Sequence, residues 1–240
     1  MKKVLYDYLT DRFKKPAAIG LEKGPLVTIS REFGCQAKDI AQILVDELAQ
    51  KKASLKNPFP WITINKEVLS DVAKELEMDP EFLNRVDTDN QRGIFGTLVF
   101  SFSHTYNVVD IKMHRILREV ITTYAERGNV VIVGRGGAIF AKDYPDALHV
   151  QLQAPIEWRM KQIASSRGIS KTEAEKLIKD MDDKRHKFMQ YLMGQHHPFT
   201  NHIFDIVINR ATMSTGGIVQ TIMKALECKM INHNNDHHNK

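Results

Sequence analysis

Leu26-Val-Thr-Ile-Ser-Arg-Glu-Phe-Gly-Cys-Gln-Ala-Lys-Asp-Ile-Ala-Gln-Ile-Leu44 is the most informative stretch of this chain. It predicts a buried strand over Leu26 to Ile29, a tight loop around Gly34, and a helix that starts with Lys38 and Asp39. A loop between a strand and a helix directs backbone N–H groups toward the space before the helix. The helix dipole adds about half a positive charge there, so the place suits a phosphate.

The loop has the shape of a P-loop but not its usual sequence. The common pattern G-x-x-x-x-G-K-[ST] has glycine where Glu32 and Ala37 stand, and serine or threonine where Asp39 stands. Lys38 would add a full positive charge beside a bound phosphate. Taken alone, the match fits an ordinary strand–loop–helix connection better, with Lys38 as a solvated lysine in the first helical turn.

Four motifs in order along the chain strengthen the phosphate interpretation. They are Ser30-Arg-Glu-Phe-Gly34 with the basic Lys38, Val130-Val-Ile-Val-Gly-Arg-Gly136, Asp182-Asp-Lys-Arg-His-Lys-Phe188, and Phe204-Asp-Ile-Val-Ile-Asn209. Together they resemble the cytidylate kinase-like family over about residues 25–227. The resemblance implies an α/β fold: a P-loop doubly wound parallel sheet with a helical acceptor-binding insertion and a helical lid.

Hydrophobic patterning agrees with alternating strands and helices. Strands are expected at Trp61 to Ile64, Val130 to Val133, His149 to Leu152 and Ile206 to Ile208. Helices are expected at Asp39 to Gln50, up to Gly128, from Pro155, from the capping box Ser170 to Glu173 up to Met193, and from Thr215 to Cys228. The predicted organisation is an N-terminal helix and linker (1–25), a nucleoside monophosphate kinase-like domain (26–230) and a disordered tail (231–240). Within the domain the insertion covers about 62–128 and the lid about 159–193.

Composition favours one enzyme-sized domain and excludes several classes. The 240 residues are 42% hydrophobic and 26% charged, with no apolar run long enough to span a membrane. Two cysteines indicate no disulfide framework and fit a cytoplasmic protein. The net charge of +5 suits an anionic small molecule and does not exclude nucleic acid. The resemblance implies nucleotides as partners, with no nucleic acid and no membrane expected. The sequence does not indicate an oligomeric state. It does not indicate a metal site either, because the histidines show no paired spacing with a third ligand.

The resemblance also implies roles for particular residues. The catalytic set is Lys38 on the donor phosphates, Arg135 on the acceptor phosphate, and Asp182 with Arg185 in the lid. The nucleotide-binding set is Ser30, Arg31, Gly34, Cys35, Gln36, Ala37, Lys38, Asp39, Gly134, Gly136, Arg159 and Arg167.

Each basic residue also has a purely structural interpretation. Arg31 could pair with Glu32, and Arg135 could be a turn residue. Asp182 and Arg185 lie three apart on a helix and could form a solvated ion pair. Asp183 could replace Asp182 as the functional acid. These alternatives stay open at the level of sequence.

The predicted function is ATP-dependent phosphoryl transfer to a nucleoside monophosphate, with ATP and Mg²⁺ as cofactors and CMP as the acceptor that the resemblance implies. Phosphoryl transfer depends mainly on positioning and on cations around the transferred group, which this set of residues provides. Because no hydroxyl follows Lys38, Ser30 or Asp39 would have to help hold the magnesium ion. The degenerate loop also favours an alternative, a nucleotide-binding regulatory protein with impaired catalysis. A kinase for another small phosphate acceptor is a third hypothesis.

Overall fold

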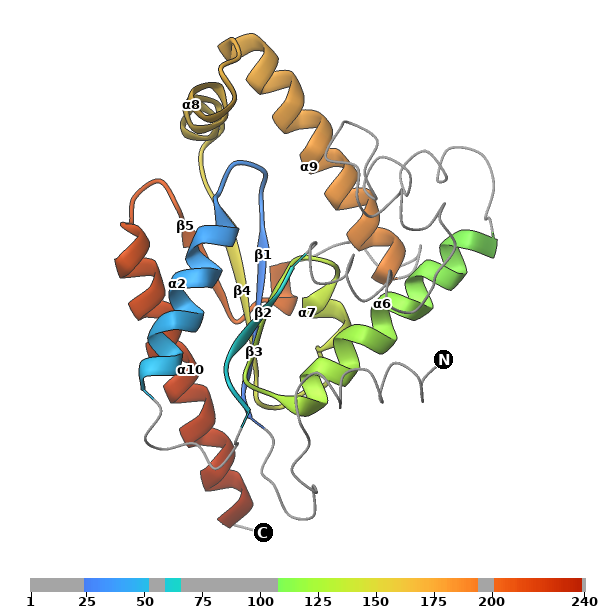
Figure 1. The fold of residues 1–240 in the computed structure, drawn as a ribbon, viewed down its shortest axis with the longest axis vertical. Helices are drawn as coiled ribbons and strands as arrows, with labels where there is room; N and C mark the ends of the chain where they lie inside the picture. Colours follow the sequence, from blue (N-terminus) through green and yellow to red (C-terminus); the bar gives the residue numbers. More distant parts are fainter. Residues whose placement is uncertain (1–23, 52–58, 66–107, 194–200, 239–240) are drawn as a thin grey trace.

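The computed structural model describes residues 24–51, 59–65, 108–193 and 201–238. Five parallel strands form one sheet in the order β2-β3-β1-β4-β5. The strands are β1 (Leu26–Arg31), β2 (Ile62–Ile64), β3 (Val130–Val133), β4 (Ala147–Gln153) and β5 (Ile206–Asn209). Because all the strands run in one direction, the loops that follow them gather at one edge of the sheet (Figure 1).

The central strands are buried on both faces, which explains their apolar sequence. Every residue of β3 is buried, as is β1 from Leu26 to Ile29. The register pairs Ile29 with Val133 on one side and with Val150 on the other. Ser30 and Arg31 therefore stand next to the loop that follows β3 and opposite the end of β4.

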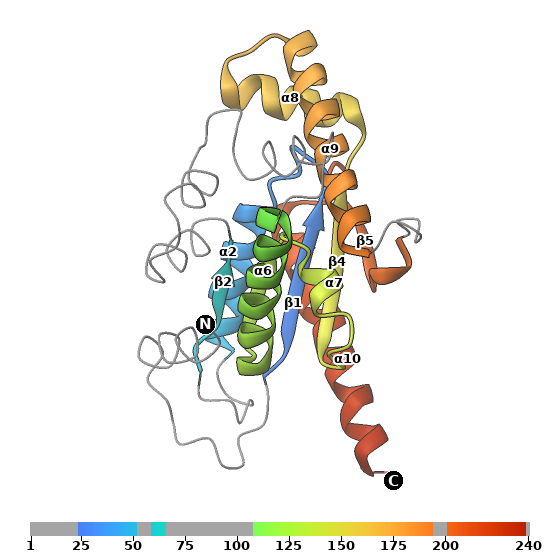
Figure 2. The ribbon, with the colours of Figure 1, turned by 90° about the vertical axis from the view of Figure 1, so that its right-hand side faces the viewer.

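Helices cover both faces of the sheet. Helices α2 (Ala37–Gln50) and α10 (Thr215–His238) lie on one face, whereas α6 (Val108–Arg127) and the short α7 (Gly137–Phe140) lie on the other (Figures 1 and 2). On α2 the buried residues Ile40, Ala41 and Leu44 recur at helical spacing. They join the core formed by one face of the sheet and by α10. This packing fixes where α2 begins, directly after the loop.

Helices α8 (Ile156–Arg167) and α9 (Lys171–Met193) lie beyond the carboxyl ends of the strands (Figure 1). The predicted capping box is present: Ser170 Oγ accepts a hydrogen bond from Glu173 N–H at 3.2 Å, and the Glu173 carboxylate accepts one from Ser170 N–H at 2.9 Å. Helices α8 and α9 share a small hydrophobic core around Ile163, Ala174 and Ile178. Phe33, from the loop after β1, packs against this core.

Several boundaries differ from the expectations. Helix α2 starts two residues early, at Ala37, and β4 extends from Ala147 to Gln153. Helix α7 was not predicted, because glycines mask its short helical segment. Helix α10 does not end near Cys228 but continues to His238, through most of the predicted tail 231–240. No glycine or proline occurs after Gly217 to stop it.

Two predicted segments can be judged only in part. The expected N-terminal helix lies outside the described residues, and so do residues 66–107 of the insertion. At the start of the insertion range, β2 is an edge strand of the sheet, where it pairs with β3. At its end, α6 stops at Arg127, just before Gly128 as predicted. Within the described residues, no helix has an apolar stretch long enough to cross a bilayer.

Candidate active site

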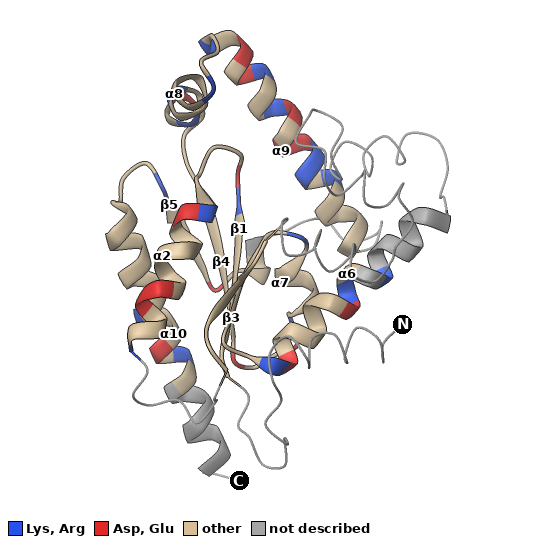
Figure 3. Cartoon of the chain, in the orientation of Figure 1, with Lys and Arg blue, Asp and Glu red and all other residues tan. Residues whose placement is uncertain are grey.

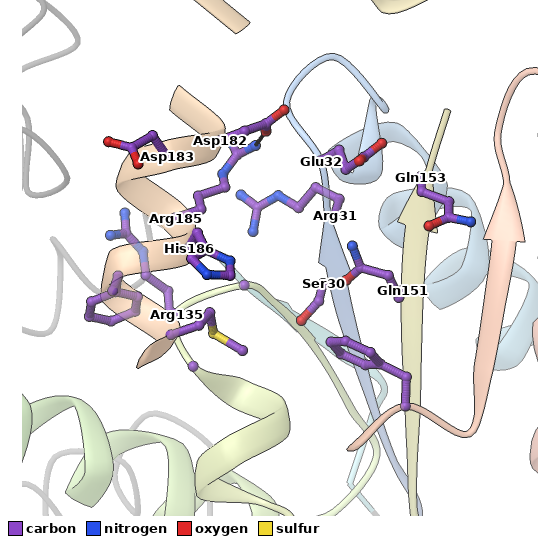
Figure 4. A pocket seen from close by; sticks show the side chains of 15 residues that line it. Ser30, Arg31, Glu32, Arg135, Gln151, Gln153, Asp182, Asp183, Arg185 and His186 are labelled. Atoms are coloured by element: carbon purple, nitrogen blue, oxygen red, sulfur yellow. Dashed lines mark ion pairs between the residues drawn. The ribbon is translucent and has the colours of Figure 1, made fainter. Parts of the chain in front are cut away.

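A pocket of about 440 Å³ lies between the carboxyl ends of β1, β3 and β4 and the side of α9 (Figure 4). Its lining combines three arginines with three acidic residues and several other polar and apolar side chains. The lining residues are Ser30, Arg31, Glu32, Gly134, Arg135, Gly136, Gln151, Gln153, Asp182, Asp183, Arg185, His186, Phe188, Met189 and Phe204. Three of the four sequence motifs contribute side chains or backbone from their central residues, and the fourth contributes Phe204.

Arg31 leaves the end of β1 and lies against the backbone of Gly134. A β-carbon at Gly134 would come within 1.8 Å of Arg31 Nη1, so only glycine leaves room for the guanidinium. Burial lowers the pKa of Arg31, as do the nearby charges of Arg185 and Arg135. Among the described residues no ion pair joins Arg31 to Glu32, whose carboxylate instead accepts the Ala154 N–H at 2.9 Å. The arrangement favours Arg31 as an anion ligand over a partner of Glu32.

Arg135 stands in a strained turn directly after β3. Gly134, Arg135 and Gly136 all have positive φ, at 72°, 57° and 72°. A left-handed arginine costs about 1 kcal/mol or more, and such strain concentrates at functional sites. The side chain lines the pocket although the residue is only 6% exposed.

Arg185 enters the pocket from α9, where acidic and basic residues alternate (Figure 3). Its Nε and Nη1 are buried and have no hydrogen-bond partner among the described residues. The Asp182 carboxylate is 3.7 Å from Nη1, and the guanidinium lies 5.3 Å from the centre of the Phe33 ring. Burial lowers the pKa of Arg185, because it disfavours the charged form. Buried guanidinium groups without acceptors suit an incoming anion.

Arg159 and Asp182 take part in a polar network beside the pocket. Arg159 donates to the carbonyl oxygens of Ala154 at 2.9 Å and Phe33 at 3.3 Å, and it forms an ion pair with Asp182. Asp182 also accepts the Phe33 N–H at 2.7 Å. Arg159 is 7% exposed and does not line the pocket. In this arrangement it connects the loop, β4 and α9.

The loop after β1 has the expected turn but turns most of its side chains away from the pocket. Gly34 has φ 95° and Gln36, which precedes α2, has φ 53°. The Cys35 thiol is buried in the core, and burial raises its pKa to about 12. Lys38 and Asp39 are exposed in the first turn of α2, and neither lines the pocket.

The predicted site residues therefore fall into two groups. Ser30, Arg31, Gly134, Arg135, Gly136, Asp182 and Arg185 share the pocket, whereas Gly34, Cys35, Gln36, Ala37, Lys38, Asp39, Arg159 and Arg167 do not line it. Arg167 is exposed, with its guanidinium 5.5 Å from the centre of the Phe33 ring. Two arginines therefore lie near the Phe33 ring: Arg167 at the end of α8 and Arg185 on α9.

Gln151, Gln153, His186 and Phe204 line the pocket but were not predicted. The register pairs Ser30 with Gln151, so side chains of β4 at alternate positions share the face that carries Ser30. That alternation was the available signal, and its use required knowing which face of β4 is buried under α10. Figure 4 shows Gln151 beside Ser30 and His186 on the side of α9 that faces the sheet.

The pocket contains oxygen ligands of the kind that Mg²⁺ prefers, although no group of three metal-binding side chains occurs among the described residues. Mg²⁺ in kinases is commonly held by one or two protein oxygens together with substrate phosphates, so a full protein cage is not needed. Ser30 and Asp183 line the pocket, whereas Asp39 does not. Ser30 would supply one such oxygen ligand, with the others coming from substrate phosphates and water.

Comparison with known proteins agrees with this geometry. The model of the cytidylate kinase-like family matches residues 26–212. A protein named cytidylate kinase from Ignicoccus hospitalis is 36% identical over 118 residues, which is 49% of this chain and 65% of that protein. The match thus spans slightly less than two thirds of the relative's length.

A solved structure with a TM-score above 0.5 shares the fold. An uncharacterized protein from Eubacterium ventriosum superimposes with a TM-score of 0.57 at 18% identity, covering 86% of this chain and 99% of that one. A gluconokinase from Sinorhizobium meliloti covers 90% of this chain and 99% of its own, with a TM-score of 0.48 at 11% identity. The second is too distant to indicate a reaction. With its parallel sheet, its arginine-lined pocket and a family match across residues 26–212, the chain belongs to the cytidylate kinase-like family.

Proposed function

We propose that this protein transfers the terminal phosphoryl group of ATP to a nucleoside monophosphate, and that CMP is the acceptor. The observation that carries the proposal is the grouping of Arg31, Arg135 and Arg185 around one pocket at the carboxyl ends of parallel strands. Ligands of open α/β sheets bind at this edge. A transferred phosphoryl group spreads its charge over three oxygens, and several arginines stabilise that charge.

The three arginines have different proposed tasks. Arg135, held by the strained turn, grips the acceptor phosphate with its planar fork. Arg185 comes from the lid helix and completes the cationic surroundings of the group in transfer. Arg31 lies between them, against Gly134, and neutralises part of the negative charge of the phosphates. Lys38 is assigned to the donor phosphates by resemblance alone, since it stands outside the pocket.

The CMP assignment depends on the family name and on the relative named cytidylate kinase. The kinase family implies ATP use, and Mg²⁺ accompanies the nucleotide in phosphoryl transfer. Gln151 and His186 also line the pocket and would lie beside an uncharged part of the acceptor.

One observation favours a second candidate, a nucleotide-binding regulatory protein with impaired catalysis. The first turn of α2 carries Ala37 and Asp39 in place of the usual glycine and hydroxyl residue, and Lys38 and Asp39 are both exposed outside the pocket. A protein of this kind would bind nucleotides through the arginines without turning them over.

A screen of ATP consumption against the common nucleoside monophosphates separates these candidates. We expect consumption with CMP to exceed that with AMP, GMP and UMP. Preference for a different monophosphate would support kinase activity but would contradict the assignment of CMP as the acceptor. Tight nucleotide binding without consumption for any acceptor would support the regulatory candidate instead.

A further inference from the structure

The carboxylate of Asp182 is held by groups of the kind that hold phosphates. Its Oδ1 accepts the Phe33 N–H at 2.7 Å, a backbone donor in the loop between β1 and α2. Its Oδ2 pairs with the Arg159 guanidinium, and Arg185 Nη1 lies 3.7 Å from Oδ1. One loop amide and two guanidinium groups thus converge on the single carboxylate of Asp182 on α9. Figure 4 shows Asp182 and Arg185 on α9 at the edge of the pocket.

The contacts around Arg159 indicate that Asp182 is not needed to satisfy it. Arg159 already donates to the Ala154 and Phe33 carbonyls, and its Nε is 3.5 Å from the Glu32 carboxylate. These three partners lie in the segments that follow β1 and β4, not in α9. Arg159 would therefore keep its place beside Phe33 if the lid carboxylate left.

The positive charge here is also incompletely matched by the carboxylates. Arg185 keeps Nε and Nη1 buried and without a hydrogen-bond acceptor while Asp182 is in place. Arg31 has no carboxylate partner among the described residues and lies near Arg185. A single carboxylate has two oxygens and one charge, whereas a phosphate group brings more of both. The surroundings are therefore better suited to a phosphate than to the carboxylate that they hold.

We propose that Phe33 N–H, Arg159 and Arg185 form a phosphate-binding site, and that Asp182 fills it when no nucleotide is bound. A phosphate group of the nucleotide would replace the carboxylate and release α9 from the loop. This proposal rests on the proposed function, since it assigns a phosphate subsite within the same kinase site. It gives Asp182 the role of an internal competitor and not that of a catalytic acid.

The test compares Asp182→Asn with Asp183→Asn, using inorganic tripolyphosphate as the probe and isothermal titration calorimetry as the measurement. Both substitutions remove one negative charge from the same turn of α9. Asp183 also lines the pocket, but it pairs with Lys187 at 2.7 Å and has no hydrogen bond to the loop among the described residues. Its variant therefore controls for the loss of one charge without the loss of the loop contact. We expect Asp182→Asn to bind the probe about tenfold more tightly than Asp183→Asn does. That ratio corresponds to a site that is open in about one molecule in ten before the substitution.

A second measurement uses the unaltered protein and does not depend on the variant folding. The ¹³C resonance of the Asp182 side-chain carboxyl group should move toward that of a solvated carboxylate when tripolyphosphate is added. Equal or weaker binding by Asp182→Asn relative to Asp183→Asn would overturn the proposal, and so would an Asp182 resonance that ignores the probe. Absence of probe binding in every variant would overturn it as well.

Failure of the inference can be distinguished from failure of the proposed function. The titration measures binding of an inorganic anion, whereas the kinase assignment is judged by ATP consumption with a monophosphate. A protein that phosphorylates CMP but shows no gain from Asp182→Asn would retain its function and lose only the internal competitor.

Discussion

At the scale of single residues, the conformation of the turn after β3 indicates where we expect the acceptor phosphate to bind. Gly134, Arg135 and Gly136 are all left-handed, and this places the Arg135 side chain in the pocket. An ammonium group cannot reproduce the two parallel hydrogen bonds of a guanidinium. We therefore expect Arg135→Lys to weaken use of the acceptor by about tenfold or more, the loss typical of one charged hydrogen bond. Steady-state kinetics with varied CMP at saturating ATP would measure it.

ATP binding serves as the control for Arg135→Lys. Titration of the variant with ATP should give an affinity near that of the original protein. An equal loss of ATP and CMP binding would instead place Arg135 on the donor side or make it purely structural.

Gly134 provides a second test at the residue scale. Gly134→Ala would force alanine into a left-handed conformation, at a cost of about 1–2 kcal/mol, and would place a β-carbon 1.8 Å from Arg31 Nη1. We expect lower thermal stability together with weaker anion binding, because the Arg31 guanidinium must move. Gly216→Ala is the control, since a β-carbon there meets nothing within 4 Å. If the Gly134→Ala protein binds nucleotide normally, the position of the Arg31 guanidinium against Gly134 is unimportant for binding.

The two cysteines should react very differently. Cys35 is buried in the core with its pKa raised to about 12, so it stays a protonated thiol at neutral pH, whereas Cys228 is exposed on α10. Iodoacetamide at pH 7.5 should label Cys228 rapidly and leave Cys35 unmodified in the folded protein, as read by peptide mass spectrometry. Equal labelling of both would contradict the burial of the loop against the core.

At the scale of elements, α8 and α9 form a unit with a core separate from the main one. Ile178 is fully buried among residues of these two helices and Phe33, whereas Ile222 on α10 is buried in the main core. Each truncation to alanine removes about 2–5 kcal/mol of packing. We expect Ile178→Ala to speed hydrogen exchange across 171–193 while the sheet stays protected, and Ile222→Ala to destabilise the sheet as well. Identical exchange patterns in the two variants would mean that α8 and α9 do not form a separate unit.

The sequence predicted the elements better than it predicted their contacts. Apolar runs such as Val130–Val133 and the capping box at Ser170 determine local structure, so both were found correctly. Spacing cannot show whether an arginine such as Arg159 points to a ligand or to backbone carbonyls, so its role at the nucleotide stays a prediction. Gln151 was missed for a related reason, since its role depends on which face of β4 the core helices cover. The extension of α10 to His238 shows that an absence of helix breakers outweighed a polar composition.

At the scale of the whole molecule, a buried histidine links stability to pH. His149 on β4 shares a 2.8 Å hydrogen bond with Thr28 Oγ1, and burial lowers its pKa, opposed by Asp205 and reinforced by Lys229. The unfolded chain therefore binds a proton more readily than the folded protein, so stability is lost as the pH falls below about 6.5. We expect the melting temperature to decrease between pH 7.5 and pH 5, and His149→Gln to reduce that decrease. An unchanged slope in the variant would assign the pH dependence to other groups.

Arg185 is the residue through which we propose that α9 takes part in the reaction. Its contact with the transferred group is expected mainly in the closed, reacting state, so Arg185→Ala should lower kcat by about a hundredfold or more with little effect on ATP affinity. Comparison of single-turnover rates with ATP titrations would separate the two effects. Full turnover by this variant would make α9 an ordinary charged helix.

Transfer of the terminal phosphoryl group from labelled ATP to CMP tests the kinase assignment most directly. Magnesium, ATP carrying ³²P on its γ-phosphate, and CMP would be incubated with the protein and the nucleotides separated by chromatography. The account predicts labelled CDP from the unaltered protein and far less from Arg135→Lys at the same protein and nucleotide concentrations. Label that remains in ATP, or that appears only as inorganic phosphate, would contradict the assignment of this pocket to phosphoryl transfer onto a monophosphate.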